Sequence, residues 1–221
     1  MLFKANTKLV LTGDSVTDFG RDRTGWPGTE PSLGTGYPRV ISAELAAVYP
    51  ELKILTINRG VSGDTTNELV ARYQADVLDL HPDVVSILIG VNDVWRHFDS
   101  TFLHPTDLVD LPLYREHYQW LIDQSKAAGA QVLVMSPFFF EANHNDPMRQ
   151  MVDEFTAAAK DLAATNDLLY IDIQARIDAY LKNNSPYLLT PDRVHPNYIG
   201  HTLVANEWLH AIGFDADHRQ A

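Results

Sequence analysis

Residues 8–18 read KLVLTGDSVTD, and this stretch decides how the rest of the chain is interpreted. A short apolar run stops at Gly13, Asp14 and Ser15, which is the pattern of a buried strand ending in a tight turn. Residues at strand ends are where α/β proteins carry much of their chemistry. Ser15 is therefore either a nucleophile or a turn residue, and the remaining segments have to decide between the two.

Four more apolar runs rich in Val, Ile and Leu predict four further strands buried on both faces, at residues 54–57, 84–89, 132–135 and 168–171. Stretches with helical periodicity lie between them, the clearest at residues 40–48, 69–80, 114–128 and 148–164. Strands that alternate with helices predict a parallel sheet covered on both sides, with right-handed crossovers. We expect a single α/β domain over residues 1–221, with long loops at residues 20–36 and 97–111 as walls of a site.

The overall charge limits the class of partner. A net charge of -12 repels phosphate backbones and anionic lipid headgroups, so neither nucleic acid nor a membrane is the expected partner. The chain has no cysteine, which excludes disulfides and thiolate metal sites. Its N-terminus lacks the apolar core of a secretion signal, and no segment stays apolar long enough to cross a bilayer, so we expect a cytoplasmic location.

Polar residues gather where the predicted strands end. Residues 13–15 (GDS), 58–65 (NRGVSGDT) and 90–93 (GVND) each follow a strand, and residues 191–196 (PDRVHP) precede the last helical stretch. In a parallel sheet these segments meet in one crevice at the carboxyl ends of the strands. Together they supply a hydroxyl, a flexible glycine loop, an amide, an imidazole and a carboxylate, which are the groups that acyl transfer requires.

Several of these residues also have a plain structural interpretation. Ser15 or Asn92 alone would more often be a turn or cap residue, and we read Asp14, Asp64 and Asp93 as turn or cap carboxylates. Two alternatives stay open: Gly60 is a minor rival to Gly63 as a backbone donor to an oxyanion, and Asp172 is a rival to Asp192 as the carboxylate that orients the histidine. Among the histidines only His195 follows a carboxylate by three residues in a loop flanked by prolines; the others considered are His97, His104, His144 and His201.

The four segments, in this order, resemble the SGNH (GDSL) hydrolase family over residues 8–209, nearly the whole chain. The resemblance implies a flavodoxin-like three-layer α/β/α sandwich with a five-stranded parallel sheet, in agreement with the pattern of strands and helices. It implies Ser15 as nucleophile, His195 as base and Asp192 as its orienting acid. It also implies an oxyanion hole formed by the Ser15 N–H, Gly63 and Asn92, and it implies no cofactor. We find no convincing metal-ligand spacing in the sequence.

Within the family, residues 13–23, 36–38, 90–100 and 136–155 are most similar to bacterial intracellular acetylxylan esterases. The expected substrate is therefore an acetylated xylan or xylo-oligosaccharide, with Trp95 and Trp26 as candidate faces for a sugar ring. The sequence departs from those relatives at Thr190 and Pro191. A lysophospholipid, a thioester or an aryl ester is the alternative substrate, and a non-catalytic flavodoxin-like binding module is a third hypothesis. Assembly of the chain into a homo-oligomer is left open.

Overall fold

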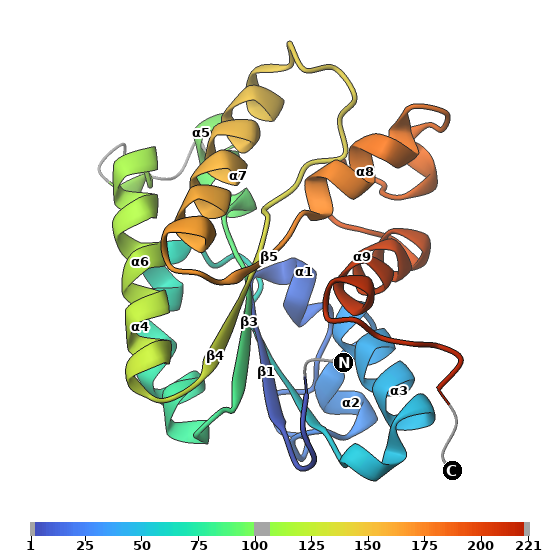
Figure 1. The fold of residues 1–221 in the computed structure, drawn as a ribbon. Helices are drawn as coiled ribbons and strands as arrows, with labels where there is room; N and C mark the ends of the chain where they lie inside the picture. Colours follow the sequence, from blue (N-terminus) through green and yellow to red (C-terminus); the bar gives the residue numbers. More distant parts are fainter. Residues whose placement is uncertain (1–2, 100–106, 219–221) are drawn as a thin grey trace.

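The computed structural model describes residues 3–99 and 107–218. Its centre is a five-stranded sheet in which every neighbouring pair is parallel, in the order β2-β1-β3-β4-β5. The strands are β1 Lys8–Gly13, β2 Leu55–Gly60, β3 Val84–Leu88, β4 Gln131–Met135 and β5 Leu169–Ile171. The predicted fold class is thus confirmed, with β1 between β2 and β3 near the middle of the sheet (Figure 1).

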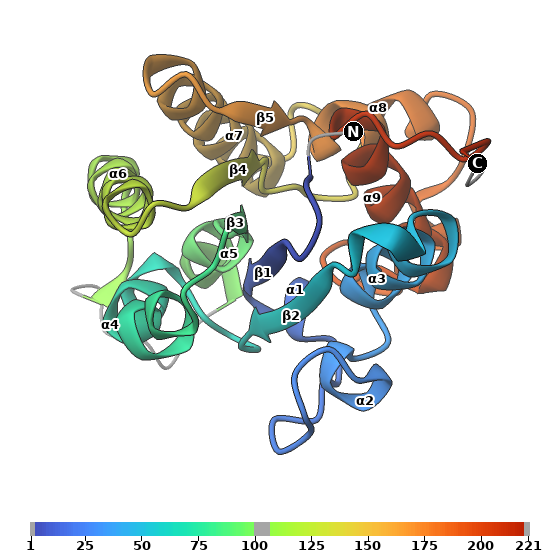
Figure 2. The ribbon, with the colours of Figure 1, turned by 60° about the horizontal axis from the view of Figure 1, so that its bottom comes forward.

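Helices cover both faces of the sheet, as Figure 2 shows in a view that brings the bottom of Figure 1 forward. The α-helices are α1 Ser15–Asp18, α2 Glu30–Leu33, α3 Tyr37–Val48, α4 Thr66–Asp76, α5 Val91–Asp99, α6 Leu111–Ala127, α7 Pro147–Thr165, α8 Ile173–Leu181 and α9 Tyr198–Ala211. Short 3₁₀ turns are η1 Pro50–Leu52, η2 Leu78–Leu80 and η4 Pro186–Leu188. The buried side chains of α4, α5, α6 and α7 form one core, and those of α1, α3, α8 and α9 form the other.

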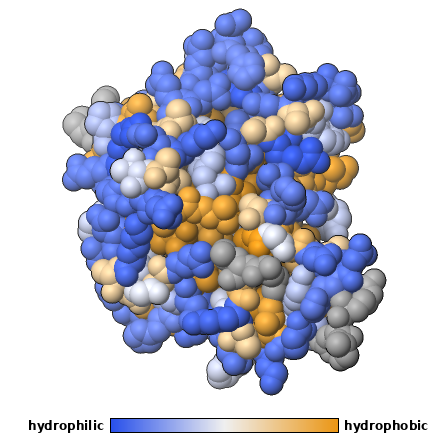
Figure 3. Space-filling model, in the orientation of Figure 1, coloured by the Kyte–Doolittle hydropathy of each residue, from blue (hydrophilic) through white to orange (hydrophobic). Residues whose placement is uncertain are grey.

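Burial of apolar side chains is what holds these layers together. On the α4–α7 side, large rings such as Tyr73, Tyr118 and Phe155 are completely buried. On the opposite side Trp208 of α9 is completely buried, and its indole Nε1 donates to the Ser86 hydroxyl at 3.0 Å. Figure 3 shows that apolar side chains reach the surface mainly in the middle of this face of the molecule, with hydrophilic ones around them.

The structure differs from the sequence-based expectation in three places. Strand β2 runs on to Gly60, so residues 58–60 belong to the strand and pair with the end of β1. The predicted loop 20–36 contains the short helix α2. In the predicted loop 97–111, α5 continues to Asp99 and α6 begins at Leu111, and residues 100–106 lie outside the described part.

Candidate active site

Ser15 occupies the first position of α1, directly after β1 ends at Gly13. Gly13 has a φ of 153°, and a Cβ built there would lie 2.0 Å from the Leu88 carbonyl oxygen, so only glycine allows β1 and β3 to approach this closely. Asp14 caps α1 by accepting a hydrogen bond from the Val16 N–H at 2.9 Å. This turn places the Ser15 hydroxyl at the carboxyl end of the sheet.

A chain of hydrogen bonds joins Ser15 to His195, which lies 180 positions later in the sequence, and continues to Asp192. The Ser15 Oγ lies 3.0 Å from His195 Nε2, and His195 Nδ1 lies 2.6 Å from Asp192 Oδ2. The other carboxylate oxygen, Asp192 Oδ1, accepts from the backbone N–H groups of Val194 and His195 at 2.9 and 2.7 Å. A hydroxyl, an imidazole and a carboxylate in this order are suited to nucleophilic catalysis, because the imidazole can take the hydroxyl proton.

The surroundings of Asp192 favour its charged form. Partial burial raises the pKa of its carboxyl, but hydrogen bonds from the His195 ring and from two backbone N–H groups outweigh that effect and leave the pKa below its ordinary value. An ionised Asp192 holds the Nδ1 proton of His195. The free lone pair of His195 is then on Nε2, which is the nitrogen that faces Ser15.

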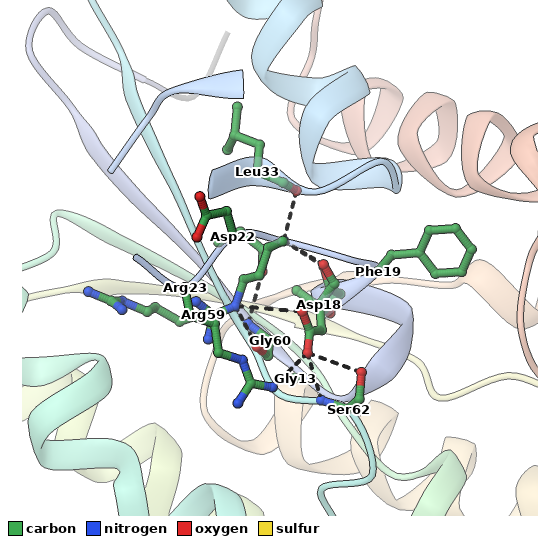
Figure 4. Close-up of polar contacts among 12 residues, drawn as sticks. Gly13, Asp18, Phe19, Asp22, Arg23, Leu33, Arg59, Gly60 and Ser62 are labelled. Carbon is green, nitrogen blue, oxygen red and sulfur yellow. Dashed lines mark hydrogen bonds and ion pairs between the residues drawn. The ribbon is translucent and has the colours of Figure 1, made fainter. Parts of the chain in front are cut away.

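The loop after β2 brings a second group of donors to Ser15. Gly63 has a φ of 91°, a backbone conformation that favours glycine. Its neighbour Ser62 donates to Asp18 through both its backbone N–H and its hydroxyl, each at 3.0 Å, and Figure 4 shows the two side by side. Since Asp18 lies one helical turn after Ser15, α1 fixes the position of this loop. Within residues 3–99 and 107–218, no acceptor is found for the backbone N–H of Ser15 or of Gly63.

Asn92 lies in the first turn of α5, is almost completely buried and is oriented from two sides. Its Oδ1 accepts from Arg96 Nη2 at 3.2 Å, and its Nδ2 donates one hydrogen to the Asp64 carbonyl at 3.0 Å. The second Nδ2 hydrogen is thereby left for a group in the cavity. Together with the N–H groups of Ser15 and Gly63, it forms a set of donors suited to a developing oxyanion.

These groups line one cavity of about 690 Å³, a volume typical of small-ligand sites. The Trp95 ring meets His195 edge-on, with 5.7 Å between the ring centroids, and the Arg96 guanidinium lies 5.2 Å from the Trp95 ring centroid. The cavity is lined by Ser15, Phe19, Gly20, Thr35, Ser62, Gly63, Asn92, Trp95, Arg96 and His195. The structure therefore brings Trp95 to the site together with every residue predicted for the triad and the oxyanion hole, Asp192 standing behind His195.

The structure separates the two open alternatives from the site. The N–H of Gly60 donates to the side-chain Oδ1 of Asn58 at 2.9 Å, so this N–H is not available to a substrate. Asp172 caps α8 through the Ala175 N–H and lies 3.6 Å from Lys160, whereas the histidine ring is held by Asp192.

The carboxylates read as structural are engaged in the protein itself. Asp14 is the cap of α1, as expected, but the other two do not cap the helices that follow them in sequence. Asp93 of α5 accepts from the Thr66 N–H and hydroxyl at the start of α4, and the Asp64 carboxylate pairs with Arg72 at 2.6 Å. Burial raises the pKa of Asp14 to about 7 and that of Asp93 to about 6.

The competing histidines lie elsewhere. His201 is completely buried beside Phe19, accepts from the Tyr37 N–H at 3.1 Å, and has its pKa lowered to about 3 by burial. His97 bonds to the Val109 carbonyl and His144 to Asp153. His104 lies outside the described residues.

Trp26, the second candidate face for a sugar ring, lies away from the cavity, and several nearby aromatic and arginine side chains are engaged within the protein. Trp26 is 83% exposed and is not among the residues that line the cavity. The three phenylalanines at 138–140 are buried in the two cores. Arg21 and Arg23 pair with Asp18, and Arg96 pairs with Asp99 and donates a hydrogen bond to Asn92.

In the part of the chain that the structure describes, no group of three or more His, Asp or Glu side chains is placed to hold a metal ion. None of the helices in these residues combines the length and apolar character needed to span a bilayer.

Comparison with known proteins matches residues 11–203 to the GDSL-like lipase/acylhydrolase family. The chain belongs to this family. As a GDSL hydrolase it is a carboxylic ester hydrolase. It is 40% identical to an acetylxylan esterase of Geobacillus stearothermophilus, over 97% of this chain and 98% of that protein.

Solved structures give the same relationship. The crystal structure of that esterase, Axe2, covers the whole of both chains with a TM-score of 0.95 at 39% identity. LAE5, described as an α/β hydrolase enzyme from the metagenome of Lake Arreo in Spain, has a TM-score of 0.93 at 38% identity over 97% of this chain and 98% of its own. Variants of Axe2 described as catalytic mutants replace a serine, an aspartate and a histidine by alanine.

The sequence did not reveal the residues that hold this GDSL hydrolase site in position. Asp18 and Ser62 hold the loop of Gly63 through a contact between segments far apart in the sequence, whereas Arg96 bonds to Asn92 from four residues later on the same helix. One signal was available for Asp18: it stands three residues after Ser15 in a predicted turn, where a buried carboxylate needs a partner.

Proposed function

We propose that this chain removes O-acetyl groups from acetylated xylan or xylo-oligosaccharides through a Ser15–His195–Asp192 triad and an acyl-enzyme intermediate. The observation that carries the proposal is the continuous hydrogen-bond chain from Ser15 Oγ through the His195 ring to Asp192. The similarity to an acetylxylan esterase over 97% of the chain supports the substrate. Residues 1–221 are proposed to act as one domain, since both cores lie against the same sheet.

The proposed reaction has two halves. His195 Nε2 takes the Ser15 proton while Ser15 Oγ attacks the acetyl carbonyl, and the negative charge that forms on the carbonyl oxygen is bound by the donors of Ser15, Gly63 and Asn92. His195 then gives the proton to the departing sugar oxygen, which leaves an acetyl ester on Ser15. Water, activated by His195, attacks that ester, and acetate leaves with Ser15 restored.

The decisive test is acetate release from acetylated xylo-oligosaccharides by the wild-type chain and by Ser15→Ala. We expect the substitution to lower kcat at least a thousandfold, since the nucleophile of a triad is lost, while the thermal unfolding temperature stays close to wild type. Ser185→Ala, at the exposed start of η4, is the matched control and should keep its activity. Retained turnover in Ser15→Ala would contradict the triad.

The same assay separates the substrate classes. An acetylxylan esterase should prefer acetyl esters of sugars to long-acyl thioesters and lysophospholipids. Higher kcat/KM on the long-acyl substrates would replace the proposed substrate while leaving the triad in place.

A further inference from the structure

A second hollow adjoins the proposed catalytic cavity at Thr35. The cavity of about 690 Å³ and a groove of about 460 Å³ share this residue as a lining residue. Thr35 is exposed, and its N–H donates to the Phe19 carbonyl at 3.0 Å, which holds it against the end of α1. A ligand that fills the catalytic cavity can therefore extend past Thr35 into the groove.

The groove lies between the outer surface of α3 and the start of α9, and we call it the α3–α9 groove. Besides Thr35, its lining residues are Arg39, Val40, Ala43 and Glu44 from α3, and Tyr198 from α9. Tyr198 is 74% exposed, so its ring is open to a ligand that enters the groove.

The chemistry of the groove suits a sugar ring. An exposed aromatic ring offers an apolar face to the C–H groups of a pyranose, and charged side chains at the rim can bond to its hydroxyls. Arg39 forms an ion pair with Glu30, and Glu44 is exposed on the same helix. The apolar surface contributed by Val40 and Ala43 is small for a long acyl chain, because each extra methylene requires its own buried area.

The position of Tyr198 relates the groove to the chemistry. Tyr198 follows His195 by three residues. Between them, the Asn197 N–H donates to the Leu189 carbonyl at 2.7 Å, and the Asn197 side chain caps α9. Tyr198 is therefore fixed relative to the base. In the proposed reaction His195 returns its proton to the leaving sugar oxygen, so the sugar belongs on the His195 side of the cavity.

We propose that the α3–α9 groove is a subsite for a further sugar unit of the oligosaccharide whose acetyl ester is cleaved at Ser15. The inference rests on the proposed function and adds to it a preference for oligosaccharides over short esters. Tyr198 is its central binding residue, by stacking against the sugar ring.

The test compares kcat/KM on acetylated xylotetraose with kcat/KM on p-nitrophenyl acetate, which is too short to reach the groove. In Tyr198→Ala the ratio of the two should fall about three- to tenfold, the size expected for loss of one stacking contact. Tyr198→Phe keeps the ring and should keep the ratio. Ala43→Trp fills the groove and should lower the ratio as Tyr198→Ala does.

Tyr187→Ala is the matched control, because this tyrosine is 80% exposed and lines neither hollow. An unchanged ratio in both Tyr198→Ala and Ala43→Trp would overturn the subsite, as would an equal loss in Tyr187→Ala. A change of oligomeric mass in Tyr198→Ala without a change of ratio would assign the surface to a contact between copies instead. If the wild-type chain releases no acetate from the oligosaccharide at all, the proposed function itself fails.

Discussion

The two sides of the proposed catalytic cavity are built in different ways. On the base side, every hydrogen bond to the Asp192 carboxylate comes from residues within three positions of it in the sequence. On the oxyanion side, Asp18 of α1 holds Ser62 beside Gly63, and Arg72 of α4 holds Asp64, whose carbonyl accepts from Asn92. Arg96 of the same helix adds one local contact to Asn92. The base side is also more open, with the Asp192 side chain 41% exposed, whereas Asn92 is 1% exposed.

This difference predicts which kinetic property a substitution on each side should change. In residues 190–195 the hydrogen bonds that orient His195 are local in sequence. Variants there should therefore change proton transfer and its pH dependence. The oxyanion side depends on contacts between distant segments, so its variants should lower kcat without changing the pH profile.

Asp192→Asn should have the larger effect. The amide has one acceptor oxygen and one donor nitrogen in place of two acceptor oxygens. It therefore favours the His195 tautomer with its proton on Nε2, the nitrogen that should accept the Ser15 proton. We expect kcat to fall about a thousandfold or more. The pH profile of the residual activity should shift as well. Asp172→Asn is the matched control, since Asp172 caps α8 away from the histidine. Equal losses in the two variants would contradict the assignment of Asp192.

Asn92→Ala removes one donor of the oxyanion side. The loss of such a donor costs roughly a hundredfold to a thousandfold in kcat, because it acts mainly on the transition state, so KM should change little. The steady-state pH profile should keep the wild-type shape. Asn166→Ala, at the end of α7 next to the opposite end of the sheet, should leave kcat near wild type. A large rise in KM with unchanged kcat would instead make Asn92 a ground-state binding residue.

Asp18→Asn tests the support of the oxyanion loop. Although burial by itself raises the pKa of Asp18, the hydrogen bonds from Arg23 and Ser62 outweigh it and lower the pKa, so this carboxylate is charged at neutral pH. Hydrogen bonds to a charged group contribute about 1.5–3 kcal/mol, and we expect roughly a tenfold fall in kcat as Ser62 and Gly63 lose their fixed position. The pH profile should not move, since Asp192 and His195 are untouched.

Asp22→Asn is the control for this variant, because Asp22 lies in the segment just after α1 and its carboxylate accepts from the N–H and hydroxyl of Thr24. If Asp18→Asn shifted the pH profile as Asp192→Asn does, the separation between the two sides of the cavity would be wrong.

The last prediction concerns the pH dependence of stability, to which Asp14 contributes, rather than activity. Burial raises its pKa to about 7 in the folded chain, from an ordinary value of 3.8. The folded state therefore binds the proton more tightly than the unfolded state. Asp14 contributes stability that is complete below about pH 4 and is lost as the pH rises through 7.

Asp14→Asn keeps the oxygen that caps α1 and removes this titration. Relative to wild type, its free energy of unfolding in urea should rise by a few kcal/mol between pH 4 and pH 8. Asp110→Asn, at the exposed cap of α6, measures the contribution of helix capping alone. A difference between Asp14→Asn and wild type that does not depend on pH would show that Asp14 ionises in both states alike.

The fold was predictable because its signals are local. Apolar runs and helical periodicity indicated five strands and the helices between them, and the order of motifs indicated the family. The strand end at residues 58–60 was missed, because Asn58 and Arg59 are poor strand residues that extend β2 through pairing with β1. Sheet pairing depends on a neighbour that is distant in sequence, so propensity alone gave a strand that was too short.

The same distinction applies to the site. Asp192 and His195 are detectable from a spacing of three residues, and Ser15 from a strand that ends in a turn. The support of the Gly63 loop was not detectable, since Asp18 and Ser62 meet only when β1 and β2 pair. The contact of Arg96 with Asn92 has the i,i+4 spacing of a helix and was overlooked rather than hidden. Capping of the next helix by Asp93 was also inferred, but packing directs its carboxylate to α4 instead.

One consequence follows from the four residues of α1. The Ser15 hydroxyl and the Asp18 carboxylate, which holds the loop at Ser62, stand on a single helical turn. We expect any displacement of this turn to carry the Ser15 hydroxyl and the loop at Ser62 together, so that the spacing between them is kept. A family member could thus tolerate sequence drift around the turn for as long as that turn itself stays intact.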